Sequence, residues 1–345
     1  MALKSPELKS PPALLCDWLE MKVLSEPHGS FRLGNLKRYW DISREIESSD
    51  PEGKSVREED TDTEGVAGPD EEIFIDSLIE EISDRRGALG DAYPFTLDGR
   101  NKLIVVEPSG AGGYMYLFCL LLTYSNGHEI FSGEWLPEIL PRTRDLFQAC
   151  STLAAAGEIR GCSISFGWPR PNSNPPFLTK LREVYALFGE GEVVASPRRG
   201  VSACPKDEEI DIIAWRPRRD RAPGTEYLLG QVASGDNWMS KPLEGKPIEN
   251  FHRNWFSQAP ASHARGFIFI PHAVPPVGFD GTRKERINAI TTRYGTIIDR
   301  LRLPLLTQQG IEIATDNPGL IIERQHDIPE IREWVIGQIN SLHQF

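Results

Sequence analysis

The chain has 345 residues, of which 39% are hydrophobic and 26% charged, and it contains 8 Trp, 15 Phe and 8 Tyr. This composition excludes a small disulfide-stapled scaffold and a wholly disordered chain, and it predicts about two domains of roughly 150 residues. The longest apolar run, residues 114–124, is about half as long as a membrane-spanning helix, and no secretory signal is recognisable. We therefore expect a soluble, cytoplasmic protein without membrane contact.

The net charge of −12 is unevenly distributed along the sequence. Residues 1–140 hold 13 basic and 27 acidic residues, a net charge of −14, whereas residues 141–345 carry a net charge of +2. An anionic surface repels nucleic acid. We therefore expect any DNA contact in the C-terminal part, and a protein partner or a shielding role for the acidic N-terminal half.

The N-terminal part contains helical patterns, an acidic stretch and one strand. The expected elements are residues 14–23 (amphipathic helix), 45–70 (acidic linker), 73–86 (helix), 102–107 (strand) and 114–124 (apolar helix). The linker holds ten acidic and two basic residues and almost no apolar ones, which predicts disorder. The predicted organisation is a helical segment over 1–44, the linker over 45–72, the rest of an N-terminal domain over 73–139, and a second domain over 140–345.

The second domain alternates helical and strand patterns. Helices are expected at 144–156, 177–188, 283–299 and 329–342, and strands at 162–168, 192–196, 209–215, 226–234 and 266–272. Such an order predicts an α/β (α+β) domain with a mixed sheet.

Several common catalytic motifs are missing. The five cysteines form no CxxC pair, which favours reduced, mostly buried thiols over structural zinc. The sequence has no HExxH, no G-x-S-x-G and no G-x-G-x-x-G after a strand, and the glycine-rich segment 108–114 lacks the Lys-[Ser/Thr] pair of a P-loop. Zinc enzymes, serine hydrolases and dinucleotide binding are therefore disfavoured.

Asp211 is the most informative residue, because it interrupts an apolar strand between Ile210 and Ile212. A charge in such a place is costly unless it has a partner such as a metal ion. Gln231 stands in the next predicted strand. If the two strands are antiparallel neighbours, both side chains converge on one cation, and oxygen ligands of this kind suit Mg²⁺ or Mn²⁺.

With Asp211 on one strand and Gln231 on the next, the pattern resembles the PD-(D/E)xK nuclease superfamily. The signature of this family is an Asp on one strand, then Glu or Gln, one residue and Lys on the following strand, after an opening helix. Residues 144–156 supply that helix, and the resemblance covers about residues 140–271. It implies a mixed-sheet, restriction-endonuclease-like domain over 140–345, preceded by a separate, partly helical N-terminal domain.

One position departs from the family pattern. Ala233 stands where the family has Lys, and Lys241 is the nearest replacement, which the resemblance gives a catalytic role beside Asp211 and Gln231. Gln148 in the opening helix stands where some family members carry Glu. The alternative is an Asp211 satisfied by backbone donors or an Arg, a Gln231 that caps a sheet hydrogen-bond network, and a Lys241 on the surface.

Arginine and tryptophan side chains are the candidates for nucleic-acid contact. Arg216, Arg218, Arg219 and Arg221 follow Asp211 closely in sequence, and they either grip phosphates or form a solvated loop. Arg198 and Arg199 present the same two alternatives. Four tryptophans are expected to pack in the core rather than stack on bases: Trp168, Trp215, Trp238 and Trp255.

These features predict a metal-dependent DNA endonuclease, or a nuclease effector of a bacterial defence or restriction system, that hydrolyses phosphodiesters. Asp211 and Gln231 would hold Mg²⁺ (or Mn²⁺), Lys241 would act on the attacking water, and Arg216, Arg218 and Arg219 would contact DNA. The defence context comes only from the resemblance. The rivals are an inactive nuclease-fold binding subunit and an unrelated α/β interaction protein.

Overall fold

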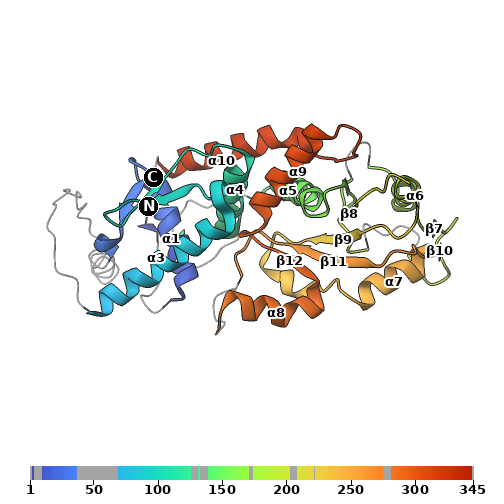
Figure 1. The fold of residues 1–345 in the computed structure, drawn as a ribbon, viewed down its shortest axis with the longest axis horizontal. Coiled ribbons are helices and arrows are strands. Elements are labelled where there is room, and N and C mark those ends of the chain that lie inside the picture. Colours follow the sequence, from blue (N-terminus) through green and yellow to red (C-terminus); the bar gives the residue numbers. More distant parts are fainter. Residues whose placement is uncertain are drawn as a thin grey trace.

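The computed structural model describes residues 2–3, 10–36, 69–125, 131–132, 139–170, 174–202, 208–220, 222–274 and 281–343. They form an elongated α/β molecule with a five-stranded sheet in one half and packed helices with a smaller sheet in the other (Figure 1). Residues 45–68 of the predicted acidic linker lie outside the described residues. None of the described helices is both long and apolar enough to cross a membrane.

The larger sheet is mixed, as the sequence predicts. Its strands are β6 (Cys162–Ser165), β8 (Ile212–Trp215), β9 (Tyr227–Val232), β11 (Ala264–Phe269) and β12 (Thr296–Ile298). They lie side by side in the order β12-β11-β9-β8-β6. β8 runs antiparallel to both of its neighbours, β6 and β9, whereas β9, β11 and β12 are parallel. Every residue of β8 is buried, because helices cover both faces of the sheet.

Helix α5 (Pro141–Ile159) covers one face of the sheet and packs against α9 (Leu303–Asp316). The two helices touch backbone to backbone at two glycines. A Cβ at Gly157 would lie 2.1 Å from the carbonyl oxygen of Leu306, and a Cβ at Gly310 would lie 2.0 Å from that of Leu153. Only glycine permits this crossing.

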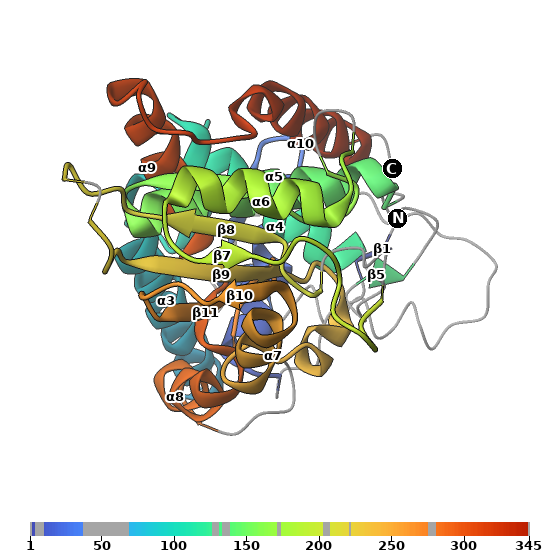
Figure 2. The ribbon, with the colours of Figure 1, turned by 90° about the vertical axis from the view of Figure 1, so that its right-hand side faces the viewer.

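The other face is covered by two groups of elements. Helices α6 (Phe177–Phe188) and α7 (Lys246–Trp255) share an apolar cluster with β6, β8 and β9. The turn η3 (Asp236–Ser240) and α8 (Arg283–Tyr294) share another with β11 and β12. Figure 2 shows β8, β9 and β11 one below the other, in the order that they have in the sheet.

The remaining elements lie mostly in the other half of the molecule. Four helices and a small antiparallel sheet make up this half: α1 (Pro12–Ser25), α3 (Pro69–Leu89), α4 (Ala111–Ser125), α10 (Ile328–Leu342), β2 (Ser30–Arg32), β4 (Lys102–Val105) and β3 (Phe95–Leu97). Short pieces complete the fold: β1 (Ala2–Leu3) with β5 (Phe131–Ser132), β7 (Glu192–Val193) with β10 (Phe256–Gln258), η1 (Leu33–Asn35), η2 (Gly90–Ala92) and η4 (Gln325–Asp327).

One apolar core crosses the expected domain boundary at residue 140. It includes Trp18 of α1, Phe118 of α4, Phe147 of α5, Phe269 of β11 and Val335 of α10. The C-terminal helix α10 thus packs against the N-terminal helices. The mixed α/β class is confirmed, but a separate N-terminal domain is not.

A buried ionic cluster joins the N-terminal helices to the end of β12. We call Asp17, Glu20, Arg85 and Arg300, which are all buried, the Arg85 cluster. Nη1 of Arg85 donates to Oδ1 of Asp17 at 2.6 Å and to Oε1 of Glu20 at 2.9 Å. Nη2 of Arg300 donates to the same oxygen of Asp17. The cluster therefore fixes three segments that are far apart in sequence.

Tyrosine hydroxyls complete the hydrogen bonding of the two buried carboxylates. The hydroxyl of Tyr93 donates to Oε1 of Glu20 and that of Tyr116 donates to Oε2 of Glu20, both at 2.7 Å. The hydroxyl of Tyr124 donates to Asp17. Burial raises the pKa of Asp17, but the guanidinium groups of Arg300 and Arg85 outweigh it and hold this pKa at about 2. Asp17 therefore stays ionised inside the protein.

Three local predictions need correction. The helix predicted from 14–23 is not amphipathic, because α1 is buried on nearly all sides, its Asp17 and Glu20 included. The helix predicted over 283–299 ends at Tyr294, because Gly295 takes a φ of 74° and the chain continues as strand β12. Helices α7 and α9 were not predicted.

Candidate metal and nucleic-acid site

Asp211 lies directly before β8 and is held by both neighbouring strands. Its N–H donates to the carbonyl oxygen of Gly230 at 2.8 Å, and its Oδ2 accepts from the N–H of Val232 at 2.8 Å. Its carbonyl oxygen accepts from Phe166 at 2.7 Å and from Gly167 at 2.9 Å. Two N–H groups opposite one carbonyl indicate a bulge at the end of β6, which sets the position of Gly167.

Because Gly167 has no side chain, the side chains of Asp211 and Gln148 can approach its Cα closely. A Cβ at Gly167 would lie 2.4 Å from Oδ1 of Asp211, 2.7 Å from Nε2 of Gln148 and 2.8 Å from Oε1 of Gln148. Nε2 of Gln148 donates to Oγ of Ser165 at 2.9 Å, which orients the amide. The carboxylate of Asp211 and the amide of Gln148, from different elements, therefore both pack against residue 167, where any side chain larger than that of glycine would clash.

Gln231 lies in β9 at the same end of the sheet. β8 and β9 are antiparallel with Ile212 opposite Gly230, so the register places Gln231 next to Asp211. The antiparallel pairing on which a shared site of Asp211 and Gln231 depends is therefore present. Gln231 is 4% exposed, and its Oε1 is buried without a hydrogen-bond partner among the described residues. A buried acceptor of this kind is costly unless a donor or a cation is bound there.

The positions after Gln231 explain the departure from the family pattern. Ala233 is buried and packs with Trp238 of η3 in an apolar cluster, so the usual Lys position faces apolar side chains. Lys241 follows η3, is partly buried, and its N–H donates to the carbonyl oxygen of Trp238 at 3.0 Å. The segment that leaves this end of β9 therefore carries the candidate lysine.

The arginine loop lies at the other end of β8. Arg216 directly follows the last residue of this four-residue strand, so it lies about 16 Å along the strand from Asp211. The loop Arg216–Arg219 is thus close to Asp211 in sequence but belongs to the opposite end of the sheet. Arg221 lies outside the described residues.

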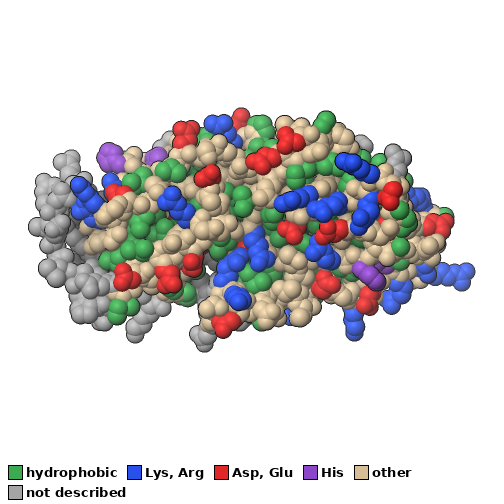
Figure 3. Space-filling model, in the orientation of Figure 1, with side chains coloured by type: hydrophobic (Ala, Val, Ile, Leu, Met, Phe, Trp, Pro, Cys, Tyr) green, Lys and Arg blue, Asp and Glu red, His purple; other side chains and the backbone are tan. Residues whose placement is uncertain are grey.

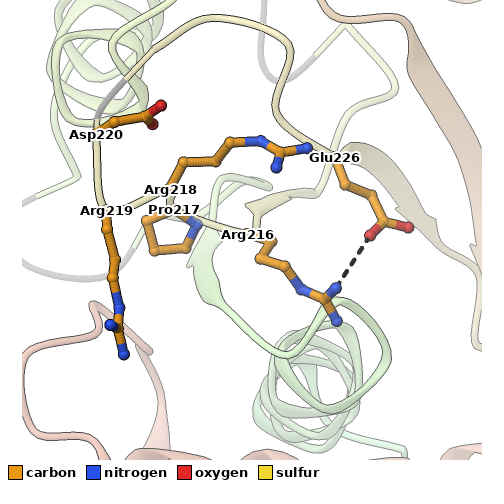
Figure 4. Close-up of a pocket in the computed structure, with 6 residues that line it drawn as sticks. All are labelled: Arg216, Pro217, Arg218, Arg219, Asp220 and Glu226. Atoms are coloured by element: carbon orange, nitrogen blue, oxygen red, sulfur yellow. Dashed lines mark ion pairs between the residues drawn. The ribbon is translucent and has the colours of Figure 1, made fainter.

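Two of the loop arginines are held by protein contacts. Nε of Arg216 donates to the carbonyl oxygen of Ile159 at 3.0 Å, and Nη1 lies 3.8 Å from Glu226, which also pairs with Arg265 at 2.7 Å. Nη2 of Arg218 donates to the carbonyl oxygen of Gly224 at 3.3 Å. Arg219 is exposed and points away from Glu226 (Figure 4).

Basic side chains are denser on one half of the molecule. Figure 3 shows more Lys and Arg side chains over the half with the five-stranded sheet than over the half with α1 and α3. This agrees with the uneven charge of the sequence. Arg198 belongs to the protein's own packing, because its Nη2 donates to the carbonyl oxygen of Phe256 at 2.5 Å, whereas Arg199 is exposed.

The tryptophans divide into two classes. Trp215, Trp238 and Trp255 are buried, as predicted. Trp168, which follows Gly167, is 45% exposed, so the prediction that it packs in the core is wrong. Neither Gly167 nor Trp168 was recognised as a site residue from the sequence. A glycine at the end of a strand is a weak signal for close approach of another group, and it was available in the segment 162–168.

The described residues contain no group of three or more His, Cys, Asp or Glu side chains that could hold a metal ion. The donor set at this end of the sheet is instead one carboxylate and the amides of Gln148 and Gln231. Carboxylate and amide oxygens are ligand types that Mg²⁺ accepts, and Mg²⁺ keeps several waters when protein ligands are few. The carboxylate of Asp211 and the buried Oε1 of Gln231 are donors of the type that such an ion would use.

Comparison with known proteins assigns no family. No family model and no solved structure matches the chain. Part of it is similar to the aspartate–tRNA(Asp/Asn) ligases of Thermoanaerobacter sp. (strain X514) and Thermoanaerobacter pseudethanolicus (strain ATCC 33223 / 39E), with 27% identity over 147 residues in each case. This match covers 40% of the chain and 24% of each ligase, so the chain spans about a quarter of the length of these curated relatives.

Proposed function

We propose that this protein is a metal-dependent DNA endonuclease that hydrolyses phosphodiesters at the end of the sheet where Asp211 and Gln231 lie. The observation that carries the proposal is the meeting of the Asp211 carboxylate and the Gln148 amide at Gly167, next to the buried, unpartnered Oε1 of Gln231. A divalent cation bound there would give the buried Oε1 of Gln231 a partner, and the Asp211 carboxylate is a ligand type that Mg²⁺ accepts.

The order of the elements supports the same proposal. A helix, α5, precedes three antiparallel strands, β6, β8 and β9, and α7 then leads to β11, which is parallel to β9. The signature that the sequence resembles has an Asp on one strand and Glu or Gln on the following strand. Asp211 lies directly before β8, and Gln231 lies in β9, the next strand. The role in a bacterial defence or restriction system rests on the resemblance alone.

Each residue has a distinct part in this proposal. Asp211 and Gln231 would hold Mg²⁺ or Mn²⁺, and Gln148, which packs against Gly167 beside Asp211, would help to position that carboxylate. A bound divalent ion would supply an activated water and would neutralise charge on the phosphate. Lys241 would orient the water by hydrogen bonding, and Arg216, Arg218 and Arg219 would contact DNA phosphates away from the cleaved bond.

The acidic N-terminal half has a different proposed partner. Its charge of −14 over residues 1–140 disfavours DNA, so a protein partner is the better candidate for this half.

The test is cleavage of supercoiled plasmid by the purified full chain in Mg²⁺ or Mn²⁺. We expect nicked and linear products that disappear in EDTA and with Asp211→Ala. Lys241→Ala should lower the rate without removing binding of the plasmid. Cleavage by Asp211→Ala at the wild-type rate would overturn the proposal.

The second candidate is a catalytically inactive binding subunit with the same fold. Two observations favour it: Ala233 is packed in an apolar cluster where the family has Lys, and the site offers a single carboxylate. This candidate predicts plasmid binding without cleavage in either metal. Binding with no product over many hours, for the wild-type chain and for Lys241→Ala alike, would favour it.

A further inference from the structure

Trp168 is exposed beside the candidate site, unlike the other tryptophans in the half of the molecule that contains the five-stranded sheet. It directly follows Gly167, the residue at which Asp211 and Gln148 meet. Its exposed fraction is 45%, whereas Trp215, Trp238 and Trp255 are buried. Burying an indole stabilises a fold more than burying almost any other side chain. The exposure of this indole beside the candidate site therefore suggests a function other than packing in the core.

The indole is supported from inside the protein by a cation. Arg170 is itself buried, and its guanidinium carbon lies 5.5 Å from the centre of the Trp168 ring and 5.1 Å and 5.6 Å from those of Phe166 and Phe177. Cation–π contact of this kind restrains the ring. The backbone N–H of Arg170 donates to Oδ1 of Asn174 at 3.0 Å, and its Nη1 donates to the carbonyl oxygen of Pro175 at 3.3 Å, so these contacts fix the position of Arg170.

We propose that Trp168 stacks on an unpaired nucleobase of the strand whose phosphate lies at Asp211. The inference rests on the proposed function for its nucleic acid, and it adds the substrate class: a strand with at least one unstacked base, either single-stranded or opened from a duplex. A flat aromatic ring that is held in place and open to solvent binds any base face, without sequence preference. A fully stacked duplex presents no such face.

The experiment measures binding of the full chain in EDTA, so that cleavage does not interfere. The probes are three fluorescein-labelled oligonucleotides of about 12 nucleotides: a single strand, its duplex, and the same strand with abasic sites in place of the central bases. Fluorescence anisotropy gives each Kd. We expect the wild-type chain to bind the intact single strand about tenfold or more tightly than the abasic strand, since base–aromatic stacking has effects of this size.

Variants of Trp168 separate stacking from folding. Trp168→Ala should bind the intact and the abasic strand equally, whereas Trp168→Phe should keep most of the difference. Leu187→Ala, a change at another exposed apolar side chain, is the matched control and should bind like wild type.

The outcomes distinguish this inference from the proposed function. Tight binding of DNA with no preference for intact over abasic strand would overturn the role of Trp168 and leave the nuclease proposal standing. Base-dependent binding that Trp168→Ala abolishes, in a chain that cleaves no plasmid, would support stacking and remove the nuclease. Absence of binding to all three probes would overturn both.

Discussion

The Arg85 cluster and the Asp211 site both set polar groups among apolar side chains, but their charges are arranged differently. In the cluster, the guanidinium groups of Arg85 and Arg300 face the carboxylates of Asp17 and Glu20, so buried charges are matched. At the Asp211 site, the carboxylate packs beside the neutral amide of Gln148, and the amide oxygen of Gln231 is buried without a hydrogen-bond partner among the described residues. Matched charges hold segments of the chain together, whereas an amide oxygen without a partner beside a carboxylate favours a cation from outside.

The first prediction concerns the matched charges. Arg85→Ala should lower the free energy of unfolding by about 3–5 kcal/mol, because it removes the buried guanidinium that pairs with both Asp17 and Glu20. Chemical denaturation followed by circular dichroism measures the change. Arg86→Ala, at the next and exposed residue, is the control and should stay within about 0.5 kcal/mol of wild type. Equal stability of the two variants would show that the cluster is dispensable.

A second prediction uses the low pKa of Asp17. This pKa is about 2 in the folded protein, below its ordinary value of 3.8, so ionised Asp17 stabilises the fold above pH 3.8, and this contribution is lost as the pH falls towards 2. The loss should amount to about 2 kcal/mol between pH 5 and pH 2. Asp17→Asn should lack this part of the pH dependence, and Asp76→Asn, at an exposed position of α3, should keep it. Parallel curves for Asp17→Asn and wild type would contradict the assignment.

The Asp211 site should also respond to an added methyl group, without any change of charge. Gly167→Ala places a methyl group against Asp211 and Gln148, so we expect plasmid cleavage to fall at least about tenfold, with a stability loss of about 1–3 kcal/mol. Gly99→Ala, where no atom lies within 4 Å of the added Cβ, is the matched control and should cleave like wild type. Full activity of Gly167→Ala would mean that cleavage does not need the close packing of Asp211 and Gln148 against residue 167.

The smallest effect is expected from the arginine loop at the opposite end of β8. Replacing Arg216, Arg218 and Arg219 with Ala should flatten the salt dependence of DNA binding by up to about three phosphate contacts and leave the cleavage mechanism intact. Since Glu226 already pairs with Arg216, Arg219→Ala alone should account for more of the change than Arg216→Ala. A fluorescence anisotropy series in salt measures both, and an unchanged slope in the triple variant would exclude the loop.

These experiments need the full chain. A fragment that begins near residue 140 would lose α1, α3 and α4 and would expose the core that Trp18 and Phe118 share with Phe269 and Val335. The sequence alone could not reveal this, because the charge difference between the halves suggested a boundary that the apolar packing crosses.

The sequence predicted elements well where the apolar period was regular. Helix α6 has the predicted bounds, and the antiparallel pairing of β8 with β9 followed from two apolar runs separated by a polar loop. Helix α9 was missed because Gly310 interrupts its pattern, and that glycine is required by the contact with α5 rather than by the helix itself. Strand β12 was missed because it has three residues and follows a helix through Gly295.

At the candidate site, sequence reasoning found the residue types but not their surroundings. Asp211 and Gln231 were visible as polar residues in apolar strands, and Gln148 came from the family pattern. Three features of the site depend on a bulge and on where strands end, which local sequence does not specify. They are the close packing at Gly167, the exposure of Trp168, and the position of Arg216 at the other end of β8 from Asp211.

The most direct test of the account is calorimetric titration of Mn²⁺ into the full chain and into Asp211→Asn, a variant that keeps the shape of the side chain and removes its charge. The account predicts one divalent-ion site in the wild-type chain and none in the variant, with unfolding curves that show both chains folded. Equal Mn²⁺ binding by the two chains would contradict it.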